Sequence, residues 1–375
     1  MAYKVPFYTH TRQYENIKTE MMAKFEEAMQ SGAYVNGPMK AQFELDLASY
    51  MGTNYAIAVG NGTDALWLTF MALGLGKGDE MITNANTFFA TAEAIWIAGA
   101  TAVLVDCDPD TYCIDPKAVK AAVTNRTKAI VPVHLYGLSA DMTAIRAIAD
   151  ENGLYVIEDN AQAIDGHGAD FKQGELSDAV CTSFITQKNL GTYGDGGAVF
   201  TNHKFINDRV RKLQNHGSNA RNVHSYGFNS RLDEIHAAIL SVKLPMIGDL
   251  TDSRIAIGDK YSAGLADVAG LKLPTTPDGY RHVMHCYIVH VDAAKRDEFV
   301  AALTEAGVEA KTHYSIAIHR QEGFPWGKDA RIAGTLANAE WNADCCVTLP
   351  LVPELTDEET SACVAITKEV AAKML

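Results

Sequence analysis

The sequence lacks any apolar segment long enough to cross a membrane. None of its windows approaches about eighteen uncharged apolar residues in a row, the length that a transmembrane helix requires. The N-terminal stretch MAYKVPFYTHTRQYENIK also lacks the apolar core of a signal peptide. The sequence therefore predicts neither secretion nor membrane insertion, and we expect a cytoplasmic protein with no membrane partner.

Positive charge and paired cysteines are also scarce. The 375 residues carry 46 acidic against 32 basic side chains, a formal net charge of -14, which argues against general affinity for nucleic acid or anionic lipid. Any anionic ligand must therefore be held by local groups. The seven cysteines are an odd number and none shows metal-ligand spacing such as C-x-x-C, so we expect reduced thiols and no metal site.

What the sequence does contain is a regular alternation of strand-like and helix-like segments. Helical patterns such as Asp64–Leu73 and Met142–Glu151 separate several short runs that are rich in strand-forming residues. This order is typical of an α/β domain built on a doubly wound, mostly parallel, seven-stranded sheet. The seven expected strands lie in NYAIAVGN, EMITNANTF, ATAVLVDCD, TKAIVPVHLYG, GLYVIEDN, AVCTSFIT and GAVFTN.

The regular alternation of strand and helix ends after about residue 245. A helical pattern over Thr251–Leu265 is followed by a strand in MHCYIVHVD, a helix near Arg296–Ala306 and a short strand in VEAKTHY. We therefore expect a large α/β domain over residues 1–245 and a smaller α+β domain over residues 246–375. Because no Gly/Ser-rich linker separates them, the two should pack tightly.

Several polar groups follow the carboxyl ends of the expected strands, where open α/β sheets bind their ligands. After the first strand, the segment GNGTDAL opens a helix whose first amides are free to bind an anion. An aromatic ring, a carboxylate and an amine follow three other strands. The candidate residues in these positions are Gly62, Thr63, Asp64, Phe88, Asp159, Gln162, Ser183 and Lys188.

Pyridoxal 5'-phosphate (PLP) uses all of these groups. It needs a lysine for a Schiff base with its aldehyde, an acid that keeps the pyridine nitrogen protonated, and an anchor for its phosphate. Each residue also has a simpler interpretation: Lys188 as a solvated loop lysine, Phe88 as core, and Asp159, Thr63 or Asp64 as a helix N-cap. Their joint occurrence in one α/β series favours the cofactor.

The same glycines allow a rival interpretation. Residues 60–65 fit G-x-G-x-x-A, a form of the dinucleotide fingerprint, and Asp79 and Glu80 lie near the distance expected for a ribose-binding acid. That acid should follow the second strand, whereas Asp79 and Glu80 precede it. An NAD-dependent oxidoreductase is therefore an alternative from a different class of enzyme.

Ten ordered blocks, which span nearly the whole chain, resemble the DegT/StrS-type sugar aminotransferases. These are PLP enzymes of the aspartate-aminotransferase fold, fold type I. The blocks are GNGTDALWLTFMALGLGKGDEMI, NTFFATAEAI, DPDTYCIDP, IVPVHLYG, VIEDNAQA, SFITQKNLGTYGDGGAVFTN, QNHG, GFNSRLDEIHAAIL, THYSIAIH and LPLVPELTDEE. The resemblance implies a homodimer with composite active sites.

By this resemblance, each candidate acquires a role. Lys188 would be the Schiff-base lysine, Asp159 the partner of the pyridinium, Gln162 the partner of the ring hydroxyl, and Phe88 the stacking ring. The phosphate ligands would be the start of the helix at Gly62, the backbone of Thr63 and Asp64, the hydroxyl of Ser183, and Asn229 from a second subunit.

The implied reaction moves an amino group from L-glutamate to a keto-sugar in two half-reactions. The NGTDAL form of the phosphate loop resembles members that act at C3 of dTDP-linked 3-keto-6-deoxyhexoses. Some relatives replace the lysine by histidine and act as dehydratases, so Lys188 favours transamination. Two alternatives stay open. The substrate could be an unactivated ketosugar or a keto-inositol, or the protein could be a PLP-binding regulator without catalysis.

One segment departs from the family pattern. The usual H-Y-P-x-P-x-H is here residues 313–319, with Ser315 and Ala317 in place of the two prolines, and Arg320 stands where leucine is common. This loop could be shaped for a different sugar. The candidate substrate ligands are His216, Arg231, Tyr314 and His319, each with an ordinary structural or surface role as its alternative.

Overall fold

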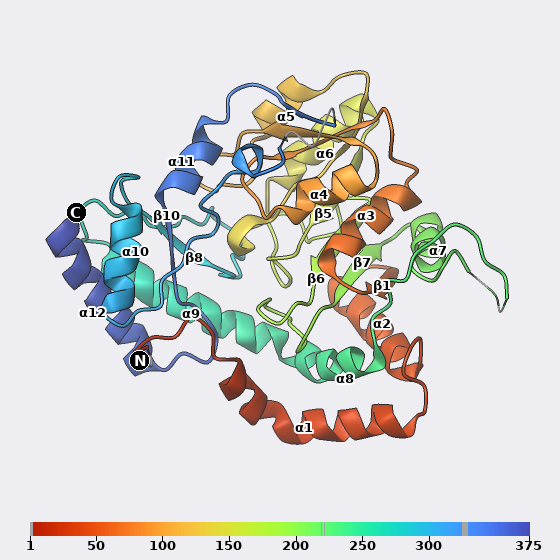
Figure 1. Cartoon of the computed structure of the whole chain (residues 1–375), viewed down its shortest axis with the longest axis horizontal. Coiled ribbons are helices and arrows are strands. Elements are labelled where there is room, and N and C mark those ends of the chain that lie inside the picture. Colours follow the sequence, from red (N-terminus) through yellow and green to blue (C-terminus); the bar gives the residue numbers. More distant parts are fainter. Residues whose placement is uncertain (1–2, 219, 221, 325–328) are drawn as a thin grey trace.

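A mixed sheet of eight strands forms the centre of the computed structural model, which describes residues 3–218, 220, 222–324 and 329–375 (Figure 1). Its strands are β1 (Tyr55–Val59), β2 (Glu80–Asn84), β3 (Thr101–Val105), β4 (Thr127–Ile130), β5 (Tyr155–Asp159), β6 (Ala179–Ser183), β7 (Gly197–Thr201) and β9 (Ala330–Ile332). The strand order is β1-β7-β6-β5-β4-β2-β3-β9. Among the described strand pairs of this sheet, only β1–β7 and β6–β7 are antiparallel.

Helices occupy the connections between the strands. The α-helices of the first part are α1 (His10–Gln30), α2 (Pro38–Met51), α3 (Gly62–Ala72), α4 (Ala90–Ile97), α5 (Pro116–Ala122), α6 (Met142–Asn152), α7 (Lys204–Leu213) and α8 (Glu234–Lys243). Those of the second part are α9 (Ile247–Leu265), α10 (Arg296–Glu305), α11 (Ala337–Cys345) and α12 (Asp357–Met374). Short 3-10 turns lie at Leu135–Gly137, Leu244–Met246 and Ile318–Arg320. Within the described residues, every helix is too short or too polar to cross a membrane.

Apolar side chains project from both faces of the large sheet, and helices cover each face. Ile57 and Val59 of β1 pack into one core, which includes side chains of α3 to α6, whereas Ala56 and Ala58 pack into the other, which includes α2 and α8. Because successive strand residues point to opposite faces, a strand between two helical layers needs apolar residues at every position. This explains the continuous apolar runs of the sequence.

The sheet contains all seven predicted strands, but the predicted count of seven is wrong. The eighth strand, β9, comes from the C-terminal part of the chain and pairs in parallel with β3. It has only three residues and no alternating pattern. It is held by Arg331, whose guanidinium donates to both carboxylate oxygens of the buried Glu80, at 3.0 and 2.7 Å. A long-range ion pair of this kind leaves no local signal in the sequence.

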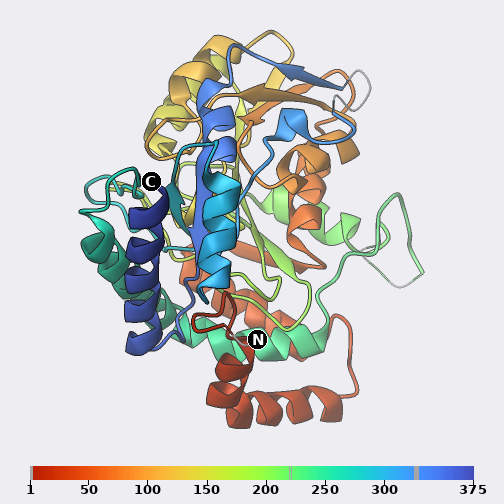
Figure 2. The same cartoon turned by 60° about the vertical axis from the view of Figure 1, so that its left-hand side comes forward.

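The C-terminal part surrounds a two-stranded antiparallel sheet of β8 (Tyr287–His290) and β10 (Cys346–Leu349). Side chains of α9, α10 and α12 form its core together with Val5, and Figure 2 shows α12 and α10 side by side. The strand predicted over residues 308–314 is wrong: this segment makes only isolated bridges, at Val308 and Lys311. The predicted division at residues 245 and 246 falls in the 3-10 turn between α8 and α9, and it stays a prediction.

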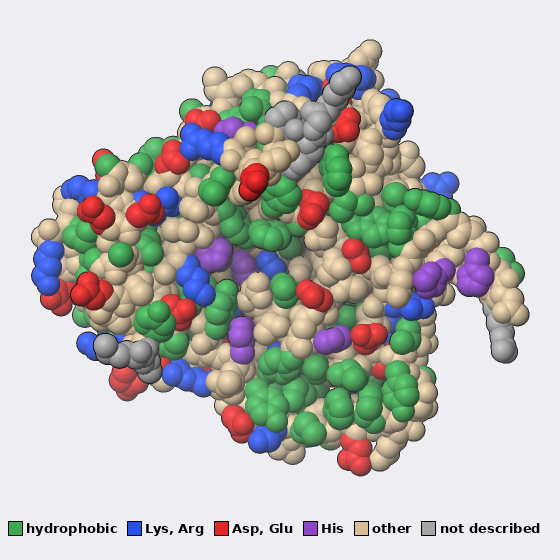
Figure 3. Space-filling model, viewed as in Figure 1, with side chains coloured by type: hydrophobic (Ala, Val, Ile, Leu, Met, Phe, Trp, Pro, Cys, Tyr) green, Lys and Arg blue, Asp and Glu red, His purple; other side chains and the backbone are tan. Residues whose placement is uncertain are grey.

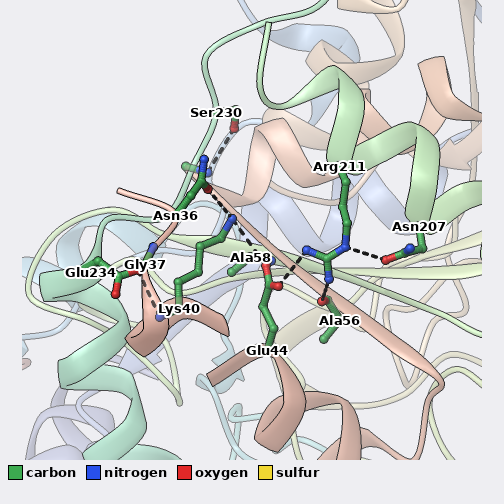
Figure 4. A network of polar contacts seen from close by, with 11 residues as sticks. Asn36, Gly37, Lys40, Glu44, Ala56, Ala58, Asn207, Arg211, Ser230 and Glu234 are labelled. Carbon is green, nitrogen blue, oxygen red and sulfur yellow. Dashed lines mark hydrogen bonds and ion pairs between the residues drawn. The ribbon is translucent and has the colours of Figure 1, made fainter. Parts of the chain in front are cut away.

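The edge strand β1 is held by side chains on its open side. Glu44 of α2 accepts a hydrogen bond from the amide of Ala58 at 2.8 Å, and Arg211 of α7 donates to the carbonyl of Ala56 at 3.0 Å (Figure 4). The two side chains also pair with each other at 2.8 Å. These contacts satisfy the backbone groups of an edge strand and fix the strand that leads into residues 60–64.

Candidate active site

A cavity of about 620 Å³ lies at the carboxyl ends of the central strands. Its walls include the start of α3, the ends of β5 and β6, and residues of the C-terminal part such as Arg254, Cys286 and Leu351. The face seen in Figure 3 is hollowed near its centre, where histidine and basic side chains are visible. Of the predicted site residues, the cavity is lined by Gly62, Thr63, Asp64, Phe88, Asp159, Gln162, Ser183, Lys188 and Tyr314.

The start of α3 provides amide groups on one side of this cavity. Asn61 is the N-cap, since its side chain accepts a hydrogen bond from the amide of Asp64 at 2.8 Å, so the interpretation of Thr63 or Asp64 as the cap is wrong. The amides of Gly62 and Thr63 lie in the first turn, where a helix supplies no acceptor of its own. A Cβ on Gly62 would lie 2.6 Å from Cβ of Ser183, so glycine is what allows the helix to approach β6 this closely.

Asp159 ends β5 and is buried. Its carboxylate accepts hydrogen bonds from the Thr91 hydroxyl at 2.7 Å and from the Ala161 amide at 3.1 Å. Burial raises the pKa of Asp159, while these two hydrogen bonds and the charge of Lys188 favour the ionised form. A turn follows Asp159 instead of a helix, so its interpretation as a helix N-cap is wrong.

Lys188 follows β6 and lines the cavity, where it is only partly exposed. Its amide donates to the carbonyl of Ile185 at 2.8 Å, which fixes the turn that carries the side chain. Burial lowers the pKa of Lys188, and the nearby Cys286 and Asp159 oppose that effect. The surroundings therefore favour the neutral form of the amine more than water does, which argues against the interpretation of Lys188 as a solvated loop lysine.

Gln162, Tyr314 and Phe88 form a connected group on another wall. The Gln162 carbonyl accepts a hydrogen bond from the amide of Tyr136 at 2.7 Å, and its amide nitrogen donates to the Tyr314 hydroxyl at 3.0 Å. The rings of Phe88 and Tyr314 have centroids 5.6 Å apart. Phe88 is 54% exposed, so its interpretation as a core residue is wrong and its ring is free to contact a ligand in the cavity.

Four predicted site residues lie outside this cavity. His216, Asn229 and Arg231 belong to the segment between α7 and α8, where Arg231 donates to the side chain of Asn215 at 2.9 Å. Asn229 is exposed. His319 has its Nε2 atom 2.9 Å from the carboxylate of Glu340, which favours the structural alternative for this residue.

The cavity also contains polar residues that the sequence analysis did not single out. Burial lowers the pKa of His313 to about 4 and that of His285 well below its ordinary value, so both imidazoles are neutral near pH 7. Arg254 lines the wall from α9. The sequence did contain a signal that Arg254 is buried. Arg254 lies three residues after Thr251 and seven before Tyr261, a spacing that places all three on one face of the helix, and this face is buried.

This set of groups fits PLP. The cavity has room for it, the open amides of Gly62 and Thr63 and the Ser183 hydroxyl suit a phosphate, and Asp159 and Lys188 supply an acid and an amine. The fold and the site together define the class of PLP-dependent transferases.

The chain belongs to the DegT/DnrJ/EryC1/StrS aminotransferase family, which it matches over residues 15–368. Members of this family are PLP-dependent aminotransferases, so the expected fold class, enzyme class and cofactor are confirmed. Family membership also removes the NAD-dependent oxidoreductase from consideration.

Two curated relatives are similar over almost the whole chain. The "Pleiotropic regulatory protein" of Geobacillus stearothermophilus is 44% identical over 358 residues, which is 95% of each chain. The "dTDP-3-amino-3,4,6-trideoxy-alpha-D-glucose transaminase" of Streptomyces venezuelae is 38% identical over 356 residues, covering 94% of this chain and 92% of the relative.

Two solved structures have the same fold. The crystal structure of DesV from S. venezuelae has a TM-score of 0.95 and 36% sequence identity, and the match covers 99% of both chains. NtdA from Bacillus subtilis, solved with the bound cofactor PMP, has a TM-score of 0.90 and 32% identity, covering 99% of this chain and 86% of that one.

Proposed function

We propose that this protein transfers an amino group from L-glutamate to a keto-sugar, and that the acceptor is a nucleotide-linked keto-deoxyhexose of the dTDP type. The observation that carries the proposal is the presence of Lys188 and Asp159 in the wall of one cavity, beside the open start of α3. The S. venezuelae relative, named as a dTDP-sugar transaminase, supports this acceptor.

Lys188 and Asp159 each have a task in this reaction. When bound, PLP supplies an electron sink for the carbanion formed at the donor's α-carbon. Lys188 would bind the cofactor, and its amine in the neutral form would accept the proton that leaves that carbon. Asp159 would hold a proton on the ring nitrogen by its negative charge, and the hydrogen bonds from Thr91 and Ala161 favour its ionised form.

The remaining residues bind and orient. The amides of Gly62 and Thr63 and the hydroxyl of Ser183 would hold the phosphate, while Phe88 would cover the ring. Gln162 would hold the ring oxygen through its amide nitrogen, which donates to Tyr314 in this structure. The amide of Asp64, named with that of Thr63 as a phosphate ligand, is already bonded to Asn61, so Gly62 and Thr63 are the better donors.

The site is completed by a second copy of the chain in this proposal. Asn229 is exposed and lies outside the cavity of its own chain, so it is available to contact the phosphate in a partner. His216 and Arg231 lie in the same segment and would reach the sugar nucleotide there. The working assembly would be a cytoplasmic homodimer with composite active sites.

The test uses the purified holoprotein. L-Glutamate should remove the yellow absorbance of the lysine-bound cofactor and release 2-oxoglutarate, and a suitable keto-sugar should restore the absorbance. The acceptor panel should contain dTDP- and UDP-linked keto-sugars, an unlinked ketosugar and a keto-inositol, with Lys188→Ala as the inactive control. Restoration by the keto-inositol or the unlinked sugar alone would contradict the nucleotide-linked acceptor.

A regulator without catalysis is the second candidate, because the relative with 44% identity is named a regulatory protein. Such a protein would bind PLP and keep its absorbance unchanged when glutamate is added. A complete change of absorbance within minutes would contradict this candidate.

A further inference from the structure

Arg254 is a buried cation without an anionic partner. Its side chain is 5% exposed, and among the residues that the structure describes no carboxylate lies within 4.0 Å of its guanidinium. An isolated charge that is removed from water costs several kcal/mol, so buried charges in proteins are normally paired. Arg254 therefore differs from arginines such as Arg211 and Arg331, which each contact a glutamate.

The guanidinium is held in place by backbone carbonyls. Its Nη1 atom donates to the carbonyl of Leu351 at 2.9 Å and approaches the carbonyl of Met284 at 3.4 Å. The Nε atom is buried and has no acceptor among the described residues. One side of the group is thus fixed by the protein, and the part of Arg254 that lines the cavity is left for another acceptor.

The guanidinium of Arg254 lies in the same cavity as the residues that carry the proposed chemistry. Arg254 and Lys188 line the same cavity, and Cys286 lies near both. Burial raises the pKa of Cys286 to about 12, and the positive charges of Lys188 and Arg254 both oppose that rise. The carboxylate that influences the pKa of Arg254 belongs to Glu354 and is already bonded to Thr9 at 2.9 Å and Gln13 at 2.8 Å.

We infer that Arg254 receives a carboxylate of the amino donor. This rests on the proposed function and names the residue that selects an amino acid as the donor. The edge of a guanidinium binds a carboxylate through two parallel hydrogen bonds, and the charge that is unpaired in the free protein would be neutralised when the donor enters. A keto-sugar has no carboxylate in this position, so Arg254 would act in only one of the two half-reactions.

The variants are chosen to separate binding from structure. Arg254→Gln removes the charge but keeps a donor for the carbonyl of Leu351, and Arg254→Lys keeps the charge without the two-pronged geometry. Arg209→Gln is the matched control, because Arg209 also donates to a backbone carbonyl, that of Ala72 at 2.7 Å, but lies outside the cavity. Each variant is purified as holoprotein and checked for the absorbance of the lysine-bound cofactor.

The two half-reactions are then measured separately by single-turnover absorbance. We expect Arg254→Gln to weaken the apparent affinity for L-glutamate by about tenfold or more, while the reaction of the pyridoxamine phosphate form with the keto-sugar stays within about threefold. Arg254→Lys should lie between wild type and Arg254→Gln, and Arg209→Gln should match wild type. Glutarate, a dicarboxylate without an amine, should raise the melting temperature of wild type but not of Arg254→Gln.

Two results would overturn the inference. One is an unchanged affinity of Arg254→Gln for glutamate. The other is an equal loss of rate in both half-reactions of Arg254→Gln while glutarate still raises the melting temperature of this variant. If Arg254→Gln fails to fold, a wild-type affinity for glutamate in Arg254→Lys, with no stabilisation of wild type by glutarate, would overturn it as well. A wild-type holoprotein that does not react with glutamate would instead refute the proposed function itself.

Discussion

At the scale of single residues, burial gives Asp159 and Lys188 the properties that PLP chemistry needs. The carboxylate is kept available for a cation by two hydrogen bonds, from Thr91 and Ala161, although burial alone would favour its neutral form. The amine is driven toward its neutral form because the cavity wall takes it out of water. The residue types were visible in the sequence, whereas the surroundings that tune them come from distant segments.

Asp159→Asn should weaken retention of PLP. The amide keeps the shape and one acceptor for the Thr91 hydroxyl, but it carries no negative charge to pair with a protonated ring nitrogen. We expect the affinity for PLP to fall by about 10- to 100-fold and turnover by more. Loss of absorbance during dialysis measures retention, and Asp170→Asn, at an exposed position, is the control. Equal retention in both variants would remove the role proposed for Asp159.

The lowered pKa of Lys188 predicts how the apoprotein captures PLP at different pH values. Only the neutral amine attacks an aldehyde, so the rate should rise with pH and level off as Lys188 becomes fully deprotonated. Because burial lowers its pKa, the plateau should begin below pH 10.5, the ordinary value for lysine. Stopped-flow absorbance measures the rate, with Lys188→Ala as the background from other lysines. A rate that still climbs beyond pH 10.5 would show that the amine is not perturbed.

At the scale of elements, the link between β1 and α3 decides where the phosphate would sit. Glu44 and Arg211 fix β1 from its open edge, and Asn61 caps α3 directly after it. The strand and helix were predictable because β1 is a continuous apolar run and the glycines of GNGTDAL mark the turn. The contact between α3 and β6 was not predictable, because Ser183 of β6 lies more than a hundred residues after Gly62 in the sequence.

Gly62→Ala should loosen this arrangement. A Cβ at this position would lie 2.6 Å from Cβ of Ser183, so the start of α3 or the end of β6 must move. We expect an affinity for PLP lower by about tenfold, since the amides and the hydroxyl would no longer converge on one phosphate. The control is Gly248→Ala, at a helical position where a Cβ meets nothing within 4 Å. Equilibrium titration with PLP provides the measurement, and equal affinities would count against the phosphate site.

At the scale of the whole molecule, the described part of the segment between α7 and α8 projects away from the body in both views (Figures 1 and 2). It exposes apolar side chains, with Tyr226 75% and Val223 53% exposed. Exposed apolar groups on a projecting arm suit contact with another protein surface. Asn229 forms an isolated bridge with Asn215, just after the end of α7, so it lies where this arm leaves the body, which suits its proposed place in a partner's site.

Mixed dimers can test whether Asn229 acts in its partner. Lys188→Ala homodimers should be inactive, and Asn229→Ala homodimers should bind PLP poorly. When the two chains are co-expressed with different tags, random pairing should restore activity in about one quarter of the sites, because one site of each mixed dimer would receive both intact residues. Absence of any restoration in purified mixed dimers would place Asn229 in its own subunit's site. Light scattering gives the size of the assembly independently.

The sequence by itself determined the order of the strands up to β7 and the family to which the chain belongs. It also determined which residues supply the amine, the carboxylate and the aromatic ring. All of these follow from apolar runs, glycine turns and motifs, which are local features. The sequence also placed Asp159 and Lys188 at or after the carboxyl ends of their strands. Only the tertiary structure decided which side chains share the cavity, that β9 joins the large sheet through Arg331 and Glu80, and that Arg254 has no anionic partner among the described residues. These features depend on contacts between distant segments, and the free energy of burial and pairing that creates them exists only once the chain has folded.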